Sequence, residues 1–372
     1  MTISISSAFD GGNIKIISQN DTVFELEIIK DNLSDFFQWF HFRVAGAAGQ
    51  ELTLKITNAG KSAFPAGWKD YQARVSEDRD YWFQTETDYD GKTLTIKYTP
   101  DGNNAWFAYW APYSMEMHHD LVAWAANQPG VTQEELGLTL DGQPFDYLTF
   151  GDGPKQIWFT ARQHPGEIMA EYWIEGALER LLDPEDSVGR LLQQKATFHV
   201  IPNMNPDGSR RGHLRTNAAG MNLNREWAEP SLEKSPEVLF ARNKMDETGV
   251  DFAIDAHGDE AIPAVFIAGF EGIPNHIPAK QALYDKYRDI LAARTPDFQT
   301  KLGYPVSPPG RANVTYATTQ IAERFGAVAM TLEMPFKDNH ELPDEDFGWS
   351  PERTKQLARD CMAVLAEMID EI

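Results

Sequence analysis

The sequence changes character once, near residue 114, and this change constrains the fold more than any other feature. Up to about Tyr113 it contains short stretches rich in β-branched and aromatic residues, separated by turn-forming residues. Beyond Ser114, helical patterns alternate with continuous apolar runs. Such runs are typical of strands that are buried on both faces, with helices packed against the sheet. We therefore predict two domains, residues 1–115 and residues 116–372.

The first part is predicted to be an all-β, sandwich-like domain. Residues 92–98 alternate polar and apolar side chains, as expected for a strand with one face in water. Strands are expected at residues 23–29, 37–44, 52–57, 81–87, 93–98 and 106–110.

The second part is predicted to be an α/β domain. Residues 167–182 place apolar side chains four residues apart on one helical stripe, and residues 351–372 form an amphipathic pattern that Ser350 is suited to cap. Strands are expected at residues 156–161, 197–202, 252–255, 264–268 and 327–334.

The charge balance excludes some classes of partner. The chain has 33 basic and 56 acidic side chains, a formal net charge of −23, which argues against nucleic acid or an anionic membrane. No apolar run approaches the length of a membrane-spanning helix. The first dozen residues do not resemble a secretory signal, so we expect a cytoplasmic protein. The one cysteine, Cys361, is predicted to be a buried thiol, and oligomeric state has no signal in the sequence.

Two segments at the ends of apolar runs carry potential metal ligands. In His-Pro-Gly-Glu, His164 and Glu167 are three residues apart at a turn where both side chains can reach one ion. By itself this pair is more typical of a loop histidine and a helix-capping glutamate than of a metal site. In Asp-Ala-His-Gly, His257 follows the run at 252–255 and could complete a set of two histidines and one carboxylate, which suits zinc.

Two further features indicate chemistry. Between residues 209 and 225 there are four arginines and no acidic residue, a local positive charge suited to clamping a carboxylate; the four are Arg210, Arg211, Arg215 and Arg225. Glu333 lies within an apolar run, where an ionised carboxylate is costly unless it is paired or functional. It could accept a proton from metal-bound water, or form a structural ion pair with an arginine. The other seven histidines are expected to be structural: His41, His118, His119, His199, His213, His276 and His340.

The order HPGE, NPDG, Arg, NLNR, DAHG and TLEMPF resembles the M14 zinc metallocarboxypeptidases, most closely the cytosolic carboxypeptidase-like branch with an N-terminal β-domain. The resemblance implies a mixed sheet flanked by helices. It implies one Zn²⁺ per chain, held by His164, Glu167 and His257, with Glu333 as the general base. It further implies that Arg215 polarises the scissile carbonyl, and that Asn224 and Arg225 bind the C-terminal carboxylate of a peptide or protein substrate.

Three positions stay open within this resemblance. Many relatives have Asp where this chain has Asn222, and an amide should support a zinc-ligand histidine less well than a carboxylate does. The tyrosine that closes over substrate is either Tyr304 or Tyr316, and a loop position favours Tyr304. If Arg311 faces the pocket, substrates with an acidic C-terminal residue are favoured.

Two other functions compete with carboxypeptidase activity. On the same fold, a zinc-dependent deacylase of small acylated amino acids also carries an HxxE and an NR pair. A non-catalytic binding protein would use the β-domain for recognition and would need no metal.

Overall fold

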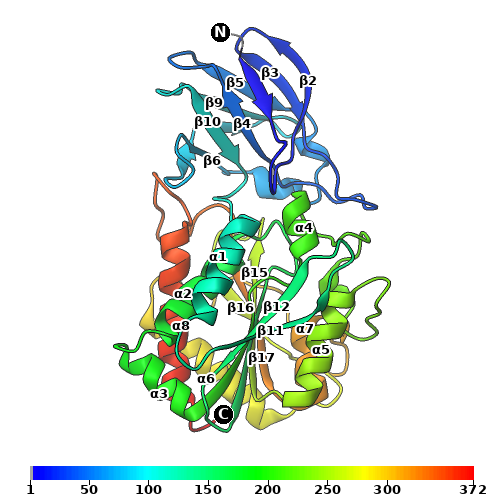
Figure 1. Cartoon of the computed structure of the whole chain (residues 1–372), viewed down its shortest axis with the longest axis vertical. Coiled ribbons are helices and arrows are strands. Elements are labelled where there is room, and N and C mark those ends of the chain that lie inside the picture. Colours follow the sequence, from blue (N-terminus) through cyan, green and yellow to red (C-terminus); the bar gives the residue numbers. More distant parts are fainter. Residues whose placement is uncertain (1–2) are drawn as a thin grey trace.

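The computed structural model describes residues 3–372, and its first part consists of two five-stranded sheets (Figure 1). The first sheet has the order β1-β4-β10-β6-β7 and is antiparallel throughout. The second has the order β2-β3-β5-β9-β8, in which β3 and β5 are parallel and the other pairs antiparallel. Aromatic side chains from the two sheets meet in one core, where the rings of Tyr98 and Phe107 are 5.9 Å apart. The predicted all-β domain is confirmed.

The strands of the first sheet are β1 (Ser4–Ser6), β4 (His41–Ala45), β6 (Ala73–Ser76), β7 (Phe83–Thr85) and β10 (Asn104–Ala108). Those of the second are β2 (Lys15–Asn20), β3 (Val23–Glu27), β5 (Leu52–Ile56), β8 (Thr87–Tyr89) and β9 (Leu94–Tyr98). Two short 3₁₀ helices complete this part, η1 (Ala59–Lys61) and η2 (Pro65–Trp68).

The single strand predicted at 81–87 is wrong, because the chain changes sheets there. β7 pairs with β6 in the first sheet, and β8 pairs with β9 in the second. Glu86 lies between them, and its carbonyl accepts a hydrogen bond from the Lys97 backbone N–H at 2.9 Å. The strands β1, β2 and β6 were not predicted. All six residues of β2 are exposed, so its sequence carries no alternation of apolar and polar residues.

The second part is a seven-stranded mixed sheet with helices on both sides, as predicted (Figure 1). Its order is β11-β12-β14-β13-β15-β17-β16, with the four central strands β14, β13, β15 and β17 parallel and the outer strands antiparallel. The strands are β11 (Thr132–Leu138), β12 (Pro144–Phe150), β13 (Lys155–Ala161), β14 (Ala196–Ile201), β15 (Phe252–Asp259), β16 (Phe266–Ala268) and β17 (Val328–Pro335). The edge pair β11 and β12 was not predicted.

Helices α2, α3, α6 and α8 pack together on one side of this sheet, and α5 and α7 lie on the other (Figure 1). The cap predicted for the last helix is present, because the Ser350 hydroxyl accepts a hydrogen bond from the Arg353 backbone N–H. The helices are α1 (Met115–Ala126), α2 (Met169–Leu181), α3 (Ser187–Lys195), α4 (Pro206–Arg211), η3 (Leu223–Arg225), α5 (Pro236–Thr248), α6 (Pro278–Arg294), α7 (Ala317–Phe325) and α8 (Pro351–Met368).

The N-terminal domain packs on the end of the sheet where β15 and β17 finish (Figure 1). The ring of Tyr109 stacks on that of Phe336 at 4.6 Å, directly after β17. Arg74 donates to the carbonyl of Lys337 at 2.9 Å and is almost fully buried. In parallel sheets, ligand sites lie at the carboxyl ends of the strands, so the N-terminal domain adjoins the region where a site is expected. The exact domain boundary at residue 115 stays a prediction.

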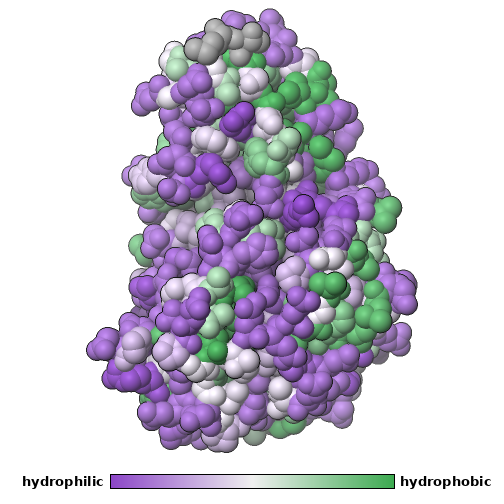
Figure 2. Space-filling view, in the orientation of Figure 1, coloured by the Kyte–Doolittle hydropathy of each residue, from purple (hydrophilic) through white to green (hydrophobic). Residues whose placement is uncertain are grey.

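Hydrophilic side chains dominate the face shown in Figure 2, in keeping with the net charge of −23. Hydrophobic residues are visible on the side of the N-terminal domain that carries β2, where Ile16 and Ile17 are exposed. Within residues 3–372, no helix has the length and apolarity needed to cross a membrane. Cys361 is buried in α8, as predicted, and burial raises the pKa of its thiol to about 12.

Candidate active site

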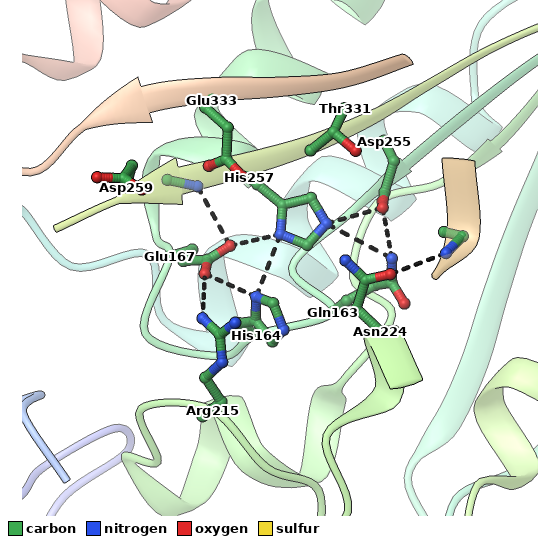
Figure 3. Close-up of polar contacts among 12 residues, drawn as sticks. Gln163, His164, Glu167, Arg215, Asn224, Asp255, His257, Asp259, Thr331 and Glu333 are labelled. Carbon is green, nitrogen blue, oxygen red and sulfur yellow. Dashed lines mark hydrogen bonds and ion pairs between the residues drawn. The ribbon is translucent and has the colours of Figure 1, made fainter. Parts of the chain in front are cut away.

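The predicted metal ligands come from two neighbouring parallel strands. His164 and Glu167 lie in the turn between β13 and α2, and His257 lies within β15, which continues to Asp259. The expectation that this strand stops at Asp255 is wrong, because β15 stays paired with β17 as far as Pro335. In that pairing His257 is opposite Glu333, so both side chains leave the sheet on the same side. The sheet register thus brings the general-base candidate to the metal-ligand candidates (Figure 3).

The turn that carries His164 and Glu167 is held in an unusual backbone conformation. Arg162 has φ of 55°, in the left-handed region that costs energy for any residue with a side chain. Its buried guanidinium donates to the carbonyl of Pro165 at 2.8 Å and to a carboxylate oxygen of Glu171 at 2.7 Å. These contacts hold the turn in place, so that the His164 side chain lies in the cleft.

The two histidines and Glu167 point their acceptor atoms at one another. His164 Nε2 is 3.0 Å from Asn222 Oδ1, and His257 Nε2 is 2.7 Å from Asp255 Oδ2. In the neutral tautomer that donates from Nε2 to these outer oxygens, the lone pair of each Nδ1 faces inward. The two Nδ1 atoms are 3.2 Å apart, and each is 2.6 Å from an oxygen of Glu167.

The two Nδ1 atoms and the Glu167 carboxylate are three acceptors that face one another, and a bound cation would stabilise this arrangement. The ligand atoms of His164, Glu167 and His257 all lie within 4.8 Å of one another, and all three residues are buried. Two imidazole nitrogens and one carboxylate match the donor set that Zn²⁺ prefers. The residues present therefore fit a zinc ion.

The charges around the triad support this interpretation. Burial and the nearby Arg215 lower the pKa of His164 to about 4, so its ring is neutral at pH 7. Burial opposes the ionised form of Glu167, but the two histidines outweigh burial and lower the pKa of its carboxyl. Burial likewise opposes a charge on His257, but Asp255 and Glu167 outweigh it and raise the pKa of that ring. The surroundings thus favour positive charge beside Glu167 and His257, whereas they keep the His164 ring neutral and able to act as a ligand.

The two histidines have different outer partners. Asp255 is a carboxylate held by the Thr160 hydroxyl at 2.7 Å and by the Gln163 side-chain amide at 2.5 Å. Asn222 is a neutral amide in a loop. Carboxylates raise the basicity of a ligand histidine more than amides do. The outer hydrogen bond of His257, to a carboxylate, therefore makes that ring a more basic ligand than His164. The contact expected between Asn222 and a ligand histidine is present, at His164.

Glu333 is a buried carboxyl of the site with one oxygen, Oε2, that has no hydrogen-bond partner among the described residues. It is 6% exposed. Its Oε1 is 3.0 Å from the hydroxyl of Tyr304, which also lies 2.7 Å from Asp259 Oδ2. Burial together with the charges of Glu167 and Asp259 raises the pKa of Glu333, whereas His257 lowers it. An orphaned buried oxygen beside a metal-ligand triad is suited to bind and deprotonate a water molecule.

The arginine side of the cleft is built from irregular chain. Arg215 Nη1 lies 3.3 Å from Glu167 Oε1, and its guanidinium carbon is 5.2 Å from the centre of the Phe64 ring in the N-terminal domain. Asn224 and Arg225 belong to η3. The guanidinium carbon of Arg225 lies 4.0 Å from the centre of the Tyr316 ring, which holds it flat. These three residues face the same cleft as the triad.

The four-arginine cluster predicted from the sequence is only half correct. Arg211 forms a two-pronged ion pair with Asp141, at 2.6 and 2.8 Å, outside the cleft. Arg210 is exposed on α4. Only Arg215 and Arg225 of the four line the cleft.

The cleft has a volume of about 460 Å³, and its lining residues belong to the catalytic domain apart from Phe64 of the N-terminal domain; they include a group of threonines. The threonines are Thr318, Thr319 and Thr331, and the hydroxyls of Thr318 and Thr331 are 2.7 Å apart. Tyr304 lines the cleft from its loop, and Tyr316 does so beside Arg225. Arg311 is exposed in a turn and is not among the described residues that line the cleft. Arg311 therefore does not face the pocket, and it gives no reason to expect a preference for substrates with an acidic C-terminal residue.

A second group of potential metal donors lies away from the cleft and consists of His118, His119 and Asp146. His118 bridges two carboxylates, with Nδ1 2.6 Å from Glu171 Oε1 and Nε2 3.3 Å from Asp146 Oδ2. Burial opposes its charge, but Glu171 and Asp146 outweigh burial and raise the pKa of His118 to about 9. Because Arg162 also pairs with Glu171, two cations balance two carboxylates without a metal.

Several residues of the site escaped prediction from the sequence. Asp255 was visible in the Asp-Ala-His-Gly segment, two residues before His257 and hence on the same face of the strand. Gln163 and Glu260 gave no such signal. Glu260 lines the cleft beside the N-terminal domain and is 5% exposed, and its Oε1 has no partner within the described chain.

A mixed sheet that presents two histidines, one carboxylate and an unpaired glutamate in a single cleft defines a metal-dependent hydrolase. Comparison with known proteins specifies it further. Residues 5–110 match the cytosolic carboxypeptidase N-terminal domain, and residues 117–249 match the zinc carboxypeptidase family. The chain belongs to the M14 zinc carboxypeptidases, in the branch that carries this N-terminal domain. His257 and Glu333 lie beyond the matched range, so their assignment rests on geometry.

Relatives of known structure cover the whole chain. A metallo-carboxypeptidase from Burkholderia cenocepacia is 42% identical with a TM-score of 0.96, and the alignment covers 100% of both chains. A metallo-carboxypeptidase from Pseudomonas aeruginosa, solved in complex with (2-guanidinoethylmercapto)succinic acid, is 43% identical with a TM-score of 0.96 over 99% of both chains.

Among curated proteins, an uncharacterized protein of Zymomonas mobilis is 64% identical over 100% of this chain and 98% of its own length. Human cytosolic carboxypeptidase 4 is 34% identical over 158 residues, which are 37% of this chain and 14% of the human protein. The chain therefore spans only a small part of that larger relative.

Proposed function

We propose that this protein removes residues from the C-terminal ends of peptides or protein tails by zinc-dependent hydrolysis. The observation that carries the proposal is that the ligand triad, of which His164 and Glu167 line the cleft, lies beside the unpaired Oε2 of Glu333 and two arginines that line the same cleft. The human relative is named cytosolic, and we propose the same compartment for this chain.

In this proposal His164, Glu167 and His257 hold the ion. When bound, zinc supplies a Lewis acid that lowers the pKa of a water molecule to about 7 and polarises the substrate carbonyl. Glu333 takes the proton from the attacking water at Oε2 and passes it to the amine that leaves. Arg215 donates to the carbonyl oxygen as negative charge develops on it, which is where a preorganised donor contributes most.

Asn224 and Arg225 are proposed to bind the free carboxylate of the substrate. Asn224 Oδ1 accepts from the Ala317 backbone N–H at 2.8 Å, which leaves the side-chain Nδ2 to donate elsewhere. The guanidinium of Arg225, stacked on Tyr316, offers a planar fork that matches a carboxylate. The compound in the structure of the Pseudomonas relative is a substituted succinic acid and thus carries two carboxylates. We propose that it also binds here and competes with peptide substrates.

The C-terminal side chain is proposed to enter the threonine-lined end of the cleft. Thr318, Thr319 and Thr331 are neutral, and Arg311 lies outside. Such a pocket favours uncharged side chains that are small or polar over acidic ones. Tyr304 is proposed as the residue that closes over substrate, because its hydroxyl already reaches Glu333 from an exposed loop.

A panel of matched peptides tests the proposal. Peptides with a free C-terminus should be shortened by the zinc-loaded enzyme, whereas the same peptides with a C-terminal amide should be resistant. Glu333→Gln should retain zinc and lose turnover. Hydrolysis of N-acyl amino acids without cleavage of any peptide would instead indicate the deacylase. Zinc binding without hydrolysis of either class of substrate would favour a non-catalytic binding protein.

A further inference from the structure

The segment that carries Arg215 has no secondary structure of its own. It lies between the end of α4 at Arg211 and the start of η3 at Leu223. Within the catalytic domain, the Leu214 carbonyl accepts from the Gly166 backbone N–H at 2.9 Å, and His213 Nδ1 donates to the Thr216 carbonyl at 2.8 Å. These two contacts leave the backbone N–H groups of residues 214–216 to find partners elsewhere.

Those partners come from a single carboxylate of the N-terminal domain. Asp31 Oδ1 accepts from the Leu214 backbone N–H at 2.7 Å. Its Oδ2 accepts from the backbone N–H groups of Arg215 at 2.8 Å and Thr216 at 2.9 Å. The Thr216 hydroxyl adds a fourth bond to Oδ2 at 3.1 Å. A carboxylate has about four acceptor positions, so this contact uses nearly all of its capacity.

Neighbouring residues of the N-terminal domain hold both ends of the same segment. The Asn32 backbone N–H donates to His213 Nε2 at 3.0 Å, and the Asn32 side chain donates to the Ala218 carbonyl at 2.9 Å. Next to His213, at the start of the segment, Asn13 donates to the Gly212 carbonyl at 2.9 Å. Asp31 and Asn13 are both at least nine-tenths buried, so water does not compete strongly for these hydrogen bonds.

The anchored backbone fixes the direction of the Arg215 side chain. The guanidinium contacts Glu167 of the metal triad (Figure 3). Its carbon also lies 5.2 Å from the centre of the Phe64 ring, which belongs to the N-terminal domain. Displacement of a catalytic group by about 1 Å can cost on the order of 100-fold in rate. Within this loop the backbone N–H groups of Leu214, Arg215 and Thr216 have no partner in the loop itself, so the loop cannot provide that precision alone.

We propose that Asp31 is a positioning residue of the active site, which acts through Arg215, and that the N-terminal domain is thereby an integral part of the catalytic centre. This inference rests on the proposed function, because it assigns Arg215 a role in the transition state. It predicts that loss of Asp31 lowers kcat with little change in KM, since Asn224 and Arg225 do not depend on it.

The decisive experiment is a double-mutant cycle on a peptide with a free C-terminus, with zinc-loaded full-length protein throughout. Asp31→Asn keeps the size of the side chain but turns an amide group toward backbone N–H donors. It should lower kcat about 10- to 100-fold. Arg215→Ala should lower kcat at least as much. In the Arg215→Ala background, Asp31→Asn should cause almost no further loss, because the group that it positions is gone.

The outcomes separate the two claims. If Arg215→Ala leaves kcat unchanged, the role proposed for Arg215 in catalysis fails. If Arg215→Ala lowers kcat but Asp31→Asn does not, or if their effects multiply, the positioning inference fails while the proposed function stands. Asp35→Asn, which changes an exposed carboxylate four residues away, is the matched control and should leave kcat unchanged. A melting temperature and zinc content for each variant exclude loss of folded protein.

A second variant keeps the inference testable if Asp31→Asn does not fold. Thr216→Val removes one of the four donors to Asp31 while keeping the shape of a fully buried side chain. It should lower kcat a few-fold and speed hydrogen exchange of the Leu214 and Arg215 amides. Unchanged kcat and unchanged exchange would contradict the inference.

Discussion

The two sides of the cleft are positioned by different means. On one side, His257 and Glu333 face each other across the paired strands β15 and β17, so the register of one sheet sets their separation. On the other side, Arg215 lies in an irregular loop that is fixed by hydrogen bonds to a different domain. The metal-ligand side is thus built by the catalytic domain itself, whereas the arginine side depends on how two domains meet.

This difference gives the N-terminal domain a role in catalysis. A domain that only narrowed the entrance could be removed without changing chemistry at the metal. A domain that supplies Asp31 and Phe64 cannot, because both contact the Arg215 segment. The following predictions test each side of this comparison, beginning with the largest expected effect.

Glu333→Gln tests the strand side directly. An amide cannot accept the proton of the attacking water, so kcat should fall by about 10³-fold or more. Steady-state kinetics on a peptide with a free C-terminus measure this, with zinc content as the check that the triad is intact. The exposed Glu341→Gln is the matched control. A Glu333→Gln enzyme with normal turnover would remove Glu333 from the mechanism.

His118→Gln tests the ion network of His118, Asp146, Glu171 and Arg162. Through Arg162 this network holds the turn that carries His164 and Glu167. The pKa of His118 is raised to about 9 in the folded protein, against 6.5 for an ordinary histidine. Its charged form therefore stabilises the fold fully below about pH 6.5, and this stabilisation is lost as pH rises through 9. The full contribution is on the order of 3 kcal/mol.

Urea unfolding of wild type and His118→Gln measures this effect. The gap between their free energies of unfolding should be largest near pH 6 and should shrink by pH 9.5. A gap that is independent of pH would show that His118 is not charged in the folded state. The exposed His276→Gln serves as the control for histidine loss alone.

Arg225→Gln tests recognition of the substrate carboxylate on the arginine side. Loss of a charge-assisted contact costs about 2 kcal/mol, so KM should rise roughly 30-fold with a smaller change in kcat. An amidated peptide lacks the carboxylate and resists cleavage, and its binding affinity should differ little between the variant and the wild type. An equal effect on both peptides would mean that Arg225 does not bind the C-terminus.

Asp255→Asn and Asn222→Asp form a matched pair that compares the supports of the two histidines. Asp255→Asn removes a carboxylate behind His257 and should weaken zinc binding about 10-fold or more. Asn222→Asp adds one behind His164 and should strengthen zinc binding by up to about 10-fold. Competition with a chelator of known affinity measures both. Unchanged or weaker binding by Asn222→Asp would contradict this account of the amide.

Much of the strand side could be predicted from the sequence, because its signals are local. An apolar run followed by His-Pro-Gly-Glu, and a second run that contains Asp-Ala-His-Gly, identify strands whose carboxyl ends must meet at one edge of a sheet. The residues that support them were harder to see. Asp255 carried a signal, since it is two residues from His257, but Gln163 reaches Asp255 only through the folded turn.

The arginine side could be predicted only in part. An excess of arginine between residues 209 and 225 is visible, but it does not separate Arg215 and Arg225, which line the cleft, from Arg211, which pairs with Asp141. The strand predicted at 81–87 was wrong for a similar reason. A strand that changes sheets has the same local pattern as one that does not, and only its pairing partners distinguish the two.

The sequence by itself determined the two-part architecture, the metal-ligand candidates and Glu333, because periodicity and motif spacing act over a few residues. Only the tertiary structure decided which arginines face the cleft, that Arg311 does not, and that Asp31 holds the Arg215 segment from 183 to 185 residues away in the sequence. A hydrogen bond between buried groups depends on their distance in space, and a carboxylate in a polar loop has the same local sequence whether it meets water or the backbone of another domain.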